Sequence, residues 1–128
     1  MLNPPYAIDR RPLTLHGYHC ALQMGPYSIN GYIDLPAGHP WLQTDPATNT
    51  TINVHGGITY QKGTTLGFDT NHYGDSYHPD SDCYQFATKH DIYIPHGHHW
   101  TWQEVEAELT RLAEQAKEAE GAQPSGNV

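Results

Sequence analysis

The clearest pattern of apolar positions lies near the C-terminus and predicts a helix over about 101–120. Its apolar residues recur at steps of three and four, which places them on one helical face. They are Trp102, Val105, Leu109, Leu112 and Ala116. The sequence from Thr101 to Glu104 is typical of a capping box, and Gly121 is a stop signal. We therefore expect an amphipathic helix that packs on the rest of the chain, followed by a flexible tail at 121–128.

The residues before this helix form short apolar runs separated by Gly, Pro and Asp, a pattern typical of short strands and loops. All Glu residues lie at or after position 104, whereas all Asp residues lie before position 92. Because Glu favours helix interiors and Asp favours turns, this segregation predicts a β and loop body followed by one helix. Strands are expected at 18–23, 27–35, 51–54, 58–60, 66–69, 84–87 and 91–94.

These elements predict an α+β fold in one domain over 1–120. We expect a small, mostly antiparallel, loop-rich sheet body with a single C-terminal amphipathic helix. The composition agrees with a small aromatic core, because nine Tyr and three Trp supply bulk that few aliphatic residues provide. A homodimer through the apolar stripe of the helix or through an exposed edge strand stays open.

The charge of the chain excludes several partners. Six Lys and Arg against fourteen Asp and Glu give a net charge of −8, so we expect no binding to long nucleic acids, which requires a basic stripe. The sequence has no apolar run of about 18 residues and no polybasic patch, so no membrane partner is expected. The N-terminus lacks the basic and apolar order of a secretory signal. We expect a cytoplasmic protein with Cys20 and Cys83 reduced.

Ten histidines are the most unusual feature of the composition, and the first segment of interest surrounds His55. Gly56 and Gly57 follow it, and paired glycines allow a sharp turn and close approach of a ligand. We expect His55 to be catalytic and both glycines to offer N–H groups to a substrate. A Gly-Gly hairpin turn that His55 merely flanks fits the spacing equally well. A His-rich stretch at 96–99 is a weaker metal-binding candidate.

The second segment is GFDTNHYGD at 67–75, in which Asp69, His72 and Asp75 follow at steps of three. Carboxylate oxygen and imidazole nitrogen at this spacing suit Zn²⁺, Mn²⁺ or Fe²⁺ if the segment turns tightly. We expect His55, Asp69 and His72 to be metal ligands. Asp75 is expected to be catalytic, either by orienting a histidine or as a general base. Alternatively, Asp69 caps a short helix and Asp75 only solvates a loop.

The order of these segments resembles a family of small proteins that is widespread in phages and prophages. The residues that carry the resemblance are Gly31-Tyr32-Ile33, Leu35-Pro36, His39-Pro40, VHGGITY at 54–60 and GFDTNHYGD at 67–75. Members often carry Cys-Ala where this chain has Thr70-Asn71, which argues against an essential thiolate at position 70. The resemblance covers about Gly31 to Ala113 and implies a functional site in a protein of the host-cell cytoplasm. Its matched positions are His55, Asp69, His72 and Asp75, with His39 as a further candidate.

We expect a small hydrolase that acts on a phosphorylated small molecule such as a nucleotide signal, with a divalent metal ion as candidate cofactor. The expected substrate-binding residues are His39, Gly56, Gly57, Tyr60 and Tyr73. One alternative is a non-enzymatic module that sequesters a host nucleotide signal on aromatic rings. Those rings are Trp41, Tyr60, Tyr73 and Trp100. Another alternative is an inhibitor of a host protein.

Overall fold

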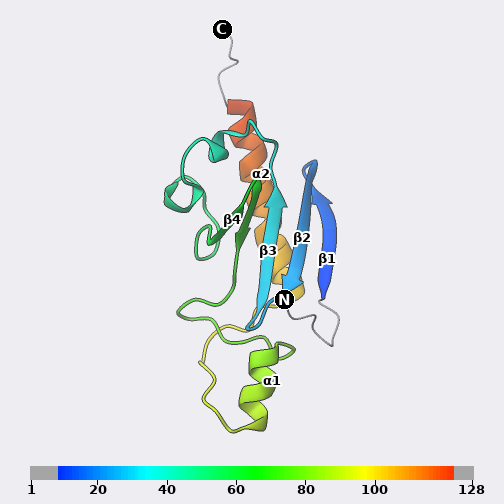
Figure 1. The fold of residues 1–128 in the computed structure, drawn as a ribbon, viewed down its shortest axis with the longest axis vertical. Helices are drawn as coiled ribbons and strands as arrows, with labels where there is room; N and C mark the ends of the chain where they lie inside the picture. Colours follow the sequence, from blue (N-terminus) through cyan, green and yellow to red (C-terminus); the bar gives the residue numbers. More distant parts are fainter. Residues whose placement is uncertain (1–8, 123–128) are drawn as a thin grey trace.

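The computed structural model describes residues 9–122 and contains a five-stranded antiparallel sheet with a long helix across one face (Figure 1). The strands are β1 (Arg10–Leu15), β2 (Tyr18–Met24), β3 (Ile29–Asp34), β4 (Tyr60–Lys62) and β5 (Thr65–Phe68). Their order in the sheet is β1-β2-β3-β5-β4. The helices are α1 (Asp82–Lys89) and α2 (Trp102–Ala122), with short 3-10 helices η1 (Pro40–Leu42) and η2 (Pro46–Thr48). The predicted α+β class is confirmed, with α1 as a second helix that the sequence pattern did not indicate.

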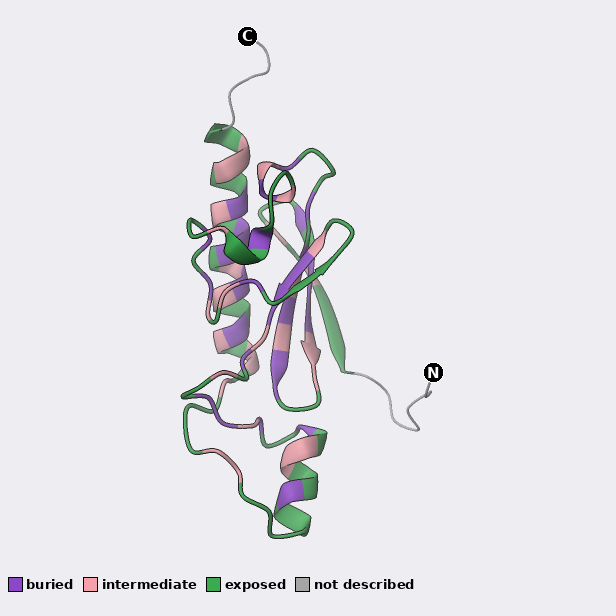
Figure 2. Cartoon of the chain, turned by 60° about the vertical axis from the view of Figure 1, so that its left-hand side comes forward, coloured by how far each residue is buried: buried purple, intermediate pink, exposed green. Residues whose placement is uncertain are grey.

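The apolar face of α2 forms the core together with the sheet, as its spacing predicts. The buried side of this helix faces the strands (Figure 2). The fully buried residues of this layer are Val105, Leu109, Leu112, Ala113 and Ala116 of α2 and Ile29, Ile33, Leu66 and Phe68 of the sheet. The capping box is confirmed, because the Thr101 N–H donates to Glu104 Oε1 at 2.9 Å and the Glu104 N–H donates to Thr101 Oγ1 at 3.1 Å. Helix α2 continues through Gly121 to Ala122, and the rest of the predicted tail lies outside the described residues.

Three of the predicted strands are wrong. Residues 84–87 belong to α1, because Ser81 caps this helix and its Oγ accepts a hydrogen bond from the Tyr84 N–H at 3.2 Å. Residues 51–54 and 91–94 are loops. The apolar side chains of Ile52 and Val54 are buried without strand pairing, so local apolarity there reflects tertiary packing.

The other four predicted strands overlap β2, β3, β4 and β5 with shifted ends, and β1 was not predicted. Strand β1 starts with two arginines and Pro12, which obscured the alternation of apolar and polar residues along it. Within residues 9–122, strand β1 lies at the edge of the sheet and pairs only with β2. An edge strand tolerates proline because its outer side has no ladder partner.

Helix α1 and the loops around it project beyond the end of the sheet (Figure 1). Backbone hydrogen bonds tie them to the β2–β3 turn: the His78 N–H donates to Tyr27 O at 2.8 Å, and the Cys83 N–H donates to Pro26 O at 3.0 Å. The Thr70 hydroxyl donates to Ile29 O at 2.8 Å. These bonds hold the loop that follows β5 against the sheet and so position one side of the candidate site.

The cysteines and the helices bear on two expectations from the sequence, the state of the thiols and the absence of a membrane partner. Cys20 and Cys83 are unpaired thiols, and burial raises the pKa of Cys20 to about 11. Between residues 9 and 122, no helix combines the length and apolarity needed to cross a membrane.

Candidate functional site

Three loops and the start of α2 meet beyond the end of β5, and the catalytic and metal-ligating residues predicted from the sequence lie there. His55 lies in the loop between η2 and β4, and Asp69, His72 and Asp75 lie in the loop that follows β5. The latter loop is joined to the segment before α2 by two backbone hydrogen bonds: the Ser76 N–H donates to His98 O, and the His98 N–H donates to Gly74 O, both at 2.9 Å. Segments that are far apart in the chain therefore share one site.

The carboxylate of Asp75 is the centre of this site. It is only 5% exposed and accepts three hydrogen bonds. Its Oδ2 lies 2.7 Å from His55 Nε2 and 2.9 Å from the His72 backbone N–H, and its Oδ1 lies 2.9 Å from Trp100 Nε1. Burial is the largest single effect on the pKa of Asp75 and raises it, but these hydrogen bonds together lower the pKa below its usual value. Asp75 is therefore ionised at neutral pH, and its hydrogen bond orients the His55 ring. The catalytic role of Asp75 stays a prediction.

His55 is held at three points, two on its ring and one on its backbone. Its Nε2 carries the hydrogen that Asp75 accepts, a tautomer assigned from the ionised partner. Its backbone N–H donates to Glu108 Oε1 of α2 at 2.8 Å, and its ring centroid lies 4.6 Å from that of Trp100. The side chain is 28% exposed, and Nδ1 has no hydrogen-bond partner among residues 9–122. This nitrogen is therefore available to a substrate or a water molecule.

Asp69 and His72 form a second pair beside the first. Asp69 Oδ1 accepts a hydrogen bond from the Asn71 N–H at 3.0 Å, and its Oδ2 accepts one from the Thr59 hydroxyl at 2.8 Å. His72 Nε2 lies 3.0 Å from Asp69 Oδ1 but is not aligned for a hydrogen bond, so the contact is an ion pair only when His72 is protonated. The rings of His55 and His72 lie 5.5 Å apart, centroid to centroid. Two His–Asp pairs thus face one another across a short distance.

Gly56 allows the two histidines to approach. Its φ is +70°, and a Cβ built on it would collide with the His72 ring. Gly57 also has a positive φ of +78°, but a Cβ there would meet open space. The Gly57 N–H donates to Val54 O at 2.9 Å and is therefore used within the turn. Of the two glycines, Gly56 is the one that the site geometry requires.

This contrast leads to a prediction with a matched control. We expect Gly56→Ala to lower the free energy of unfolding by more than Gly57→Ala, because both substitutions carry the left-handed backbone cost of about 1–2 kcal/mol but only the first collides with His72. Thermal and urea unfolding of both variants would measure the difference. Equal effects would show that the His72 ring moves away freely from position 56.

The remaining predicted substrate-binding residues lie elsewhere or outside the hydrogen-bond network. His39 is 1% exposed in the core, where its Nδ1 accepts from the Trp41 N–H at 3.0 Å and its Nε2 contacts Ala116 O at 2.9 Å. Both ring nitrogens are thus occupied, and no atom remains for a ligand. Tyr60 packs edge-on against Tyr32, with the ring centroids 5.2 Å apart. Tyr73, the residue after His72, is fully exposed.

The predicted metal ligands do not converge on one point. His55 and His72 each direct Nε2 toward a different carboxylate, and Asp69 is engaged by Thr59 and Asn71. In the part of the chain that the structure describes, no three His, Cys, Asp or Glu side chains are arranged to hold a metal ion. The metal site predicted from the sequence therefore stays a prediction.

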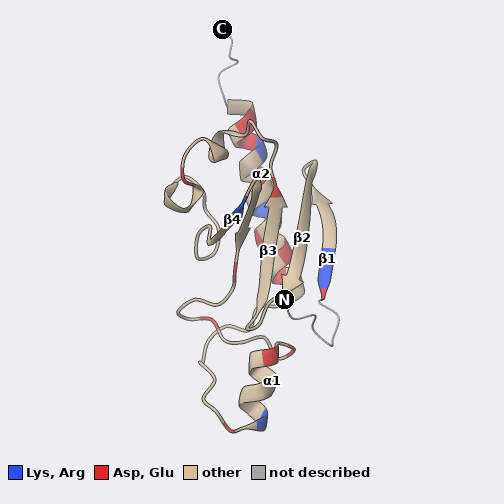
Figure 3. Ribbon diagram, viewed as in Figure 1, with Lys and Arg blue, Asp and Glu red and all other residues tan. Residues whose placement is uncertain are grey.

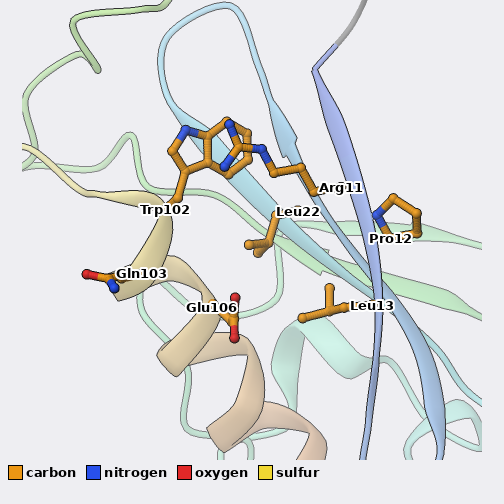
Figure 4. Close-up of a pocket in the computed structure, with 7 residues that line it drawn as sticks. All are labelled: Arg11, Pro12, Leu13, Leu22, Trp102, Gln103 and Glu106. Carbon is orange, nitrogen blue, oxygen red and sulfur yellow. The ribbon is translucent and has the colours of Figure 1, made fainter.

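A separate hollow lies between β1 and the first turns of α2 (Figure 4). Its volume is about 250 Å³, below the roughly 300–1,000 Å³ that is usual for ligand pockets. It is lined by Arg11, Pro12, Leu13, Leu22, Trp102, Gln103 and Glu106. The Arg11 guanidinium lies 3.5 Å from the centroid of the Trp102 ring and covers part of the hollow. None of the predicted site residues contributes to it.

Sequence reasoning missed two residues that hold the site together. It treated Trp100 only as a stacking ring, whereas its indole N–H also donates to Asp75. Glu108 was not predicted, although it binds the backbone of His55 and is itself held by Arg111 at 2.8 Å. Its position next to Leu109 at the border of the apolar stripe was the only available signal.

Comparisons of the chain with protein-family models, with curated proteins and with solved structures found no match. The function of the protein is therefore inferred from the contacts within this chain.

The carboxylates of this region predict a loss of stability in acid. Burial is the largest single effect on the pKa of Glu108 and raises it, but the hydrogen bonds with Arg111 and the His55 backbone lower the pKa overall. The pKa of Glu104 is also lowered, chiefly by the hydrogen bond from the Thr101 N–H. Because the folded pKa values of these groups and of Asp75 lie below the unfolded values of about 4, they stabilise the fold above that pH. We expect the melting temperature to fall as the pH drops below about 4. A melting temperature that stays constant in this range would contradict these contacts.

Proposed function

We propose that this protein is a small phosphoester hydrolase in which His55 is the general base. The observation that carries this proposal is the pair of His55 and buried Asp75, whose atoms Nε2 and Oδ2 are 2.7 Å apart, together with the unbonded Nδ1 of the same ring. A carboxylate that holds one nitrogen of a histidine fixes its tautomer and stabilises the imidazolium that forms when the other nitrogen accepts a proton.

The proposed reaction uses one water molecule. His55 Nδ1 takes a proton from the water as its oxygen forms a bond to phosphorus, and the bond from phosphorus to the leaving oxygen breaks. Asp75 stays ionised and pairs with the imidazolium through Nε2. The Trp100 and His72 N–H groups keep the carboxylate in place, because each of them donates to it.

Imidazole groups are the available partners for a phosphate at this site. Lys and Arg residues are spread over β1, α1, β4 and α2 rather than grouped around it (Figure 3). Arg111, which lies in the same part of α2 as Glu108, is already paired with that carboxylate. A substrate with one phosphate group therefore suits the site better than a polyanion, in keeping with a small phosphorylated molecule.

The test is turnover of a panel of nucleotide phosphoesters by the full chain and by His55→Asn. We expect the variant to lose about 10²–10⁴-fold in kcat/KM, the usual contribution of a general base, while it still folds and unfolds in one cooperative transition. His16→Asn is the matched control, since His16 lies in the β1–β2 turn and its φ of +51° suits Asn. Hydrolysis that persists in His55→Asn would overturn the proposal.

Two further outcomes of the same panel are informative. Activity that EDTA abolishes and Zn²⁺ or Mn²⁺ restores would replace the metal-free mechanism with a metal-dependent one. A nucleotide that binds tightly and is recovered unchanged after heat denaturation would instead identify a sequestering module. In that case the exposed rings of Tyr60 and Tyr73 would be the first binding residues to replace.

A further inference from the structure

We propose that α1 is the contact surface of a weak homodimer, in which two copies of this helix pack antiparallel about a two-fold axis near Phe86. The apolar stripe of α2, which the sequence left open as a dimer contact, is buried against the sheet and is not available. The contact through α1 lies outside the candidate site, so it does not depend on the proposed hydrolysis.

The exposed face of α1 carries an acid, an aromatic ring and a base in that order. Asp82, Phe86 and Lys89 follow at steps of four and three, so they lie on one face of the helix. All three are exposed, and the Phe86 side chain is 58% exposed. Ala87, the buried residue of this helix, lies on the other side. A large apolar side chain between two opposite charges, all in reach of solvent, is a feature that a partner can cover.

The two charges of this face are unpaired within residues 9–122. Asp82 and Lys89 lie at opposite ends of α1 (Figure 3). Neither of them takes part in the ion pairs of this part of the chain. Because α1 also projects beyond the end of the sheet (Figure 1), a second molecule can approach this face.

An antiparallel arrangement makes this face complementary to itself. The midpoint between Asp82 and Lys89 lies beside Phe86. A two-fold axis at this point therefore brings Asp82 of each copy opposite Lys89 of the other and places the two Phe86 rings together. A parallel arrangement would instead place like charges side by side. Since two chains of net charge −8 repel each other overall, this local match of charges is what permits their association.

The contact is small, which sets its expected strength. Eight helical residues span about 12 Å, so the buried area falls at the low end of protein interfaces, below about 1,200 Å². The His90 ring stacks on Phe86, with the centroids 4.2 Å apart, and so limits the side-chain entropy that association costs. We expect a dissociation constant on the order of 100 µM, so that the chain is monomeric at low micromolar concentration.

The central experiment uses two charge reversals that should fail alone and succeed together. Asp82→Lys gives the face two positive charges, and Lys89→Asp gives it two negative ones, so we expect each variant alone to stay monomeric. In an equimolar mixture the two faces attract at both ends, and the heterodimer should have a dissociation constant within about threefold of the parent value. Each reversal changes the net charge of −8 by two units, to −6 and −10, so overall attraction cannot explain such pairing.

Sedimentation equilibrium of the full chain from about 5 to 500 µM gives the dissociation constants. Phe86→Ala removes the apolar centre and keeps a good helix former, and it should weaken the dimer by at least about tenfold. Lys62→Asp is the matched control for Lys89→Asp, because it changes the net charge equally but lies on β4 at the opposite edge from β1. It should shift the dissociation constant by less than about twofold.

Three results would overturn the proposal. The first is a parent chain that stays monomeric over the whole range, which would leave Phe86 to a different partner. The second is a dimer that Phe86→Ala and Lys89→Asp leave as strong as the parent. The third is a mixture of the two reversed variants that stays monomeric although both of them melt like the parent, which would place the dimer contact elsewhere.

Discussion

Replacing Asp75 with alanine is expected to lower the free energy of unfolding by about 3 kcal/mol and to abolish hydrolysis. The substitution leaves three donors without their acceptor: the His55 ring, the His72 backbone N–H and the Trp100 indole N–H. A buried donor that loses its partner costs roughly 1–3 kcal/mol, and Asp75 is buried. Part of this loss is recovered because His55 is partly exposed and can be hydrated. Urea unfolding gives the free energy, and turnover of the nucleotide panel gives the activity.

Asp75→Asn is the matched variant for this prediction. It keeps the size of the side chain and one oxygen acceptor but turns an NH₂ group toward one of the donors. We expect a stability between those of the parent and Asp75→Ala, with activity still lost because the amide cannot stabilise an imidazolium. If Asp75→Ala melts like the parent, the carboxylate does not hold these loops together. If it retains turnover, the His55 proposal fails.

Leu109→Ala is the second substitution with a large expected effect, a loss of about 3 kcal/mol in the free energy of unfolding. Leu109 is fully buried at the middle of the contact between α2 and the sheet. Removing its side chain takes away apolar burial and leaves a cavity, because the neighbouring strands relax only in part. For a domain of this size, whose stability is on the order of 10 kcal/mol, this is a substantial fraction.

Ile92→Ala provides the control for a lost aliphatic side chain outside the core. Ile92 is 50% exposed in the loop that follows α1, so we expect a loss below about 1 kcal/mol. Chemical unfolding of the two variants at equal protein concentration measures the difference. A loss in Ile92→Ala as large as that in Leu109→Ala would mean that the projecting part of the chain is covered by a partner, which in solution could be a second copy of this chain.

Much of the candidate site follows from the sequence because its key residues lie in two short segments. Gly56 next to His55, and the steps from Asp69 to His72 and Asp75, indicate polar chemistry through residue type and spacing alone. The structure brings these residues together but pairs them differently, with His55 against Asp75 and His72 against Asp69. His39 looked equivalent in sequence, yet it lies under α2 with both ring nitrogens in use. Spacing cannot separate a core histidine from a site histidine, because His39 and His55 both lie directly beside a glycine.

The sequence by itself determined the elements whose stability is local. Helix α2 carries its apolar period and its capping box within one segment, and the turn at Gly56 follows from paired glycines. Only the tertiary structure decided which loops meet, because the partners of Asp75 come from positions 55, 72 and 100, and no local pattern connects them. It also decided that β1 joins the sheet. Contacts between distant segments stabilise those features, and a short window of sequence does not contain such contacts.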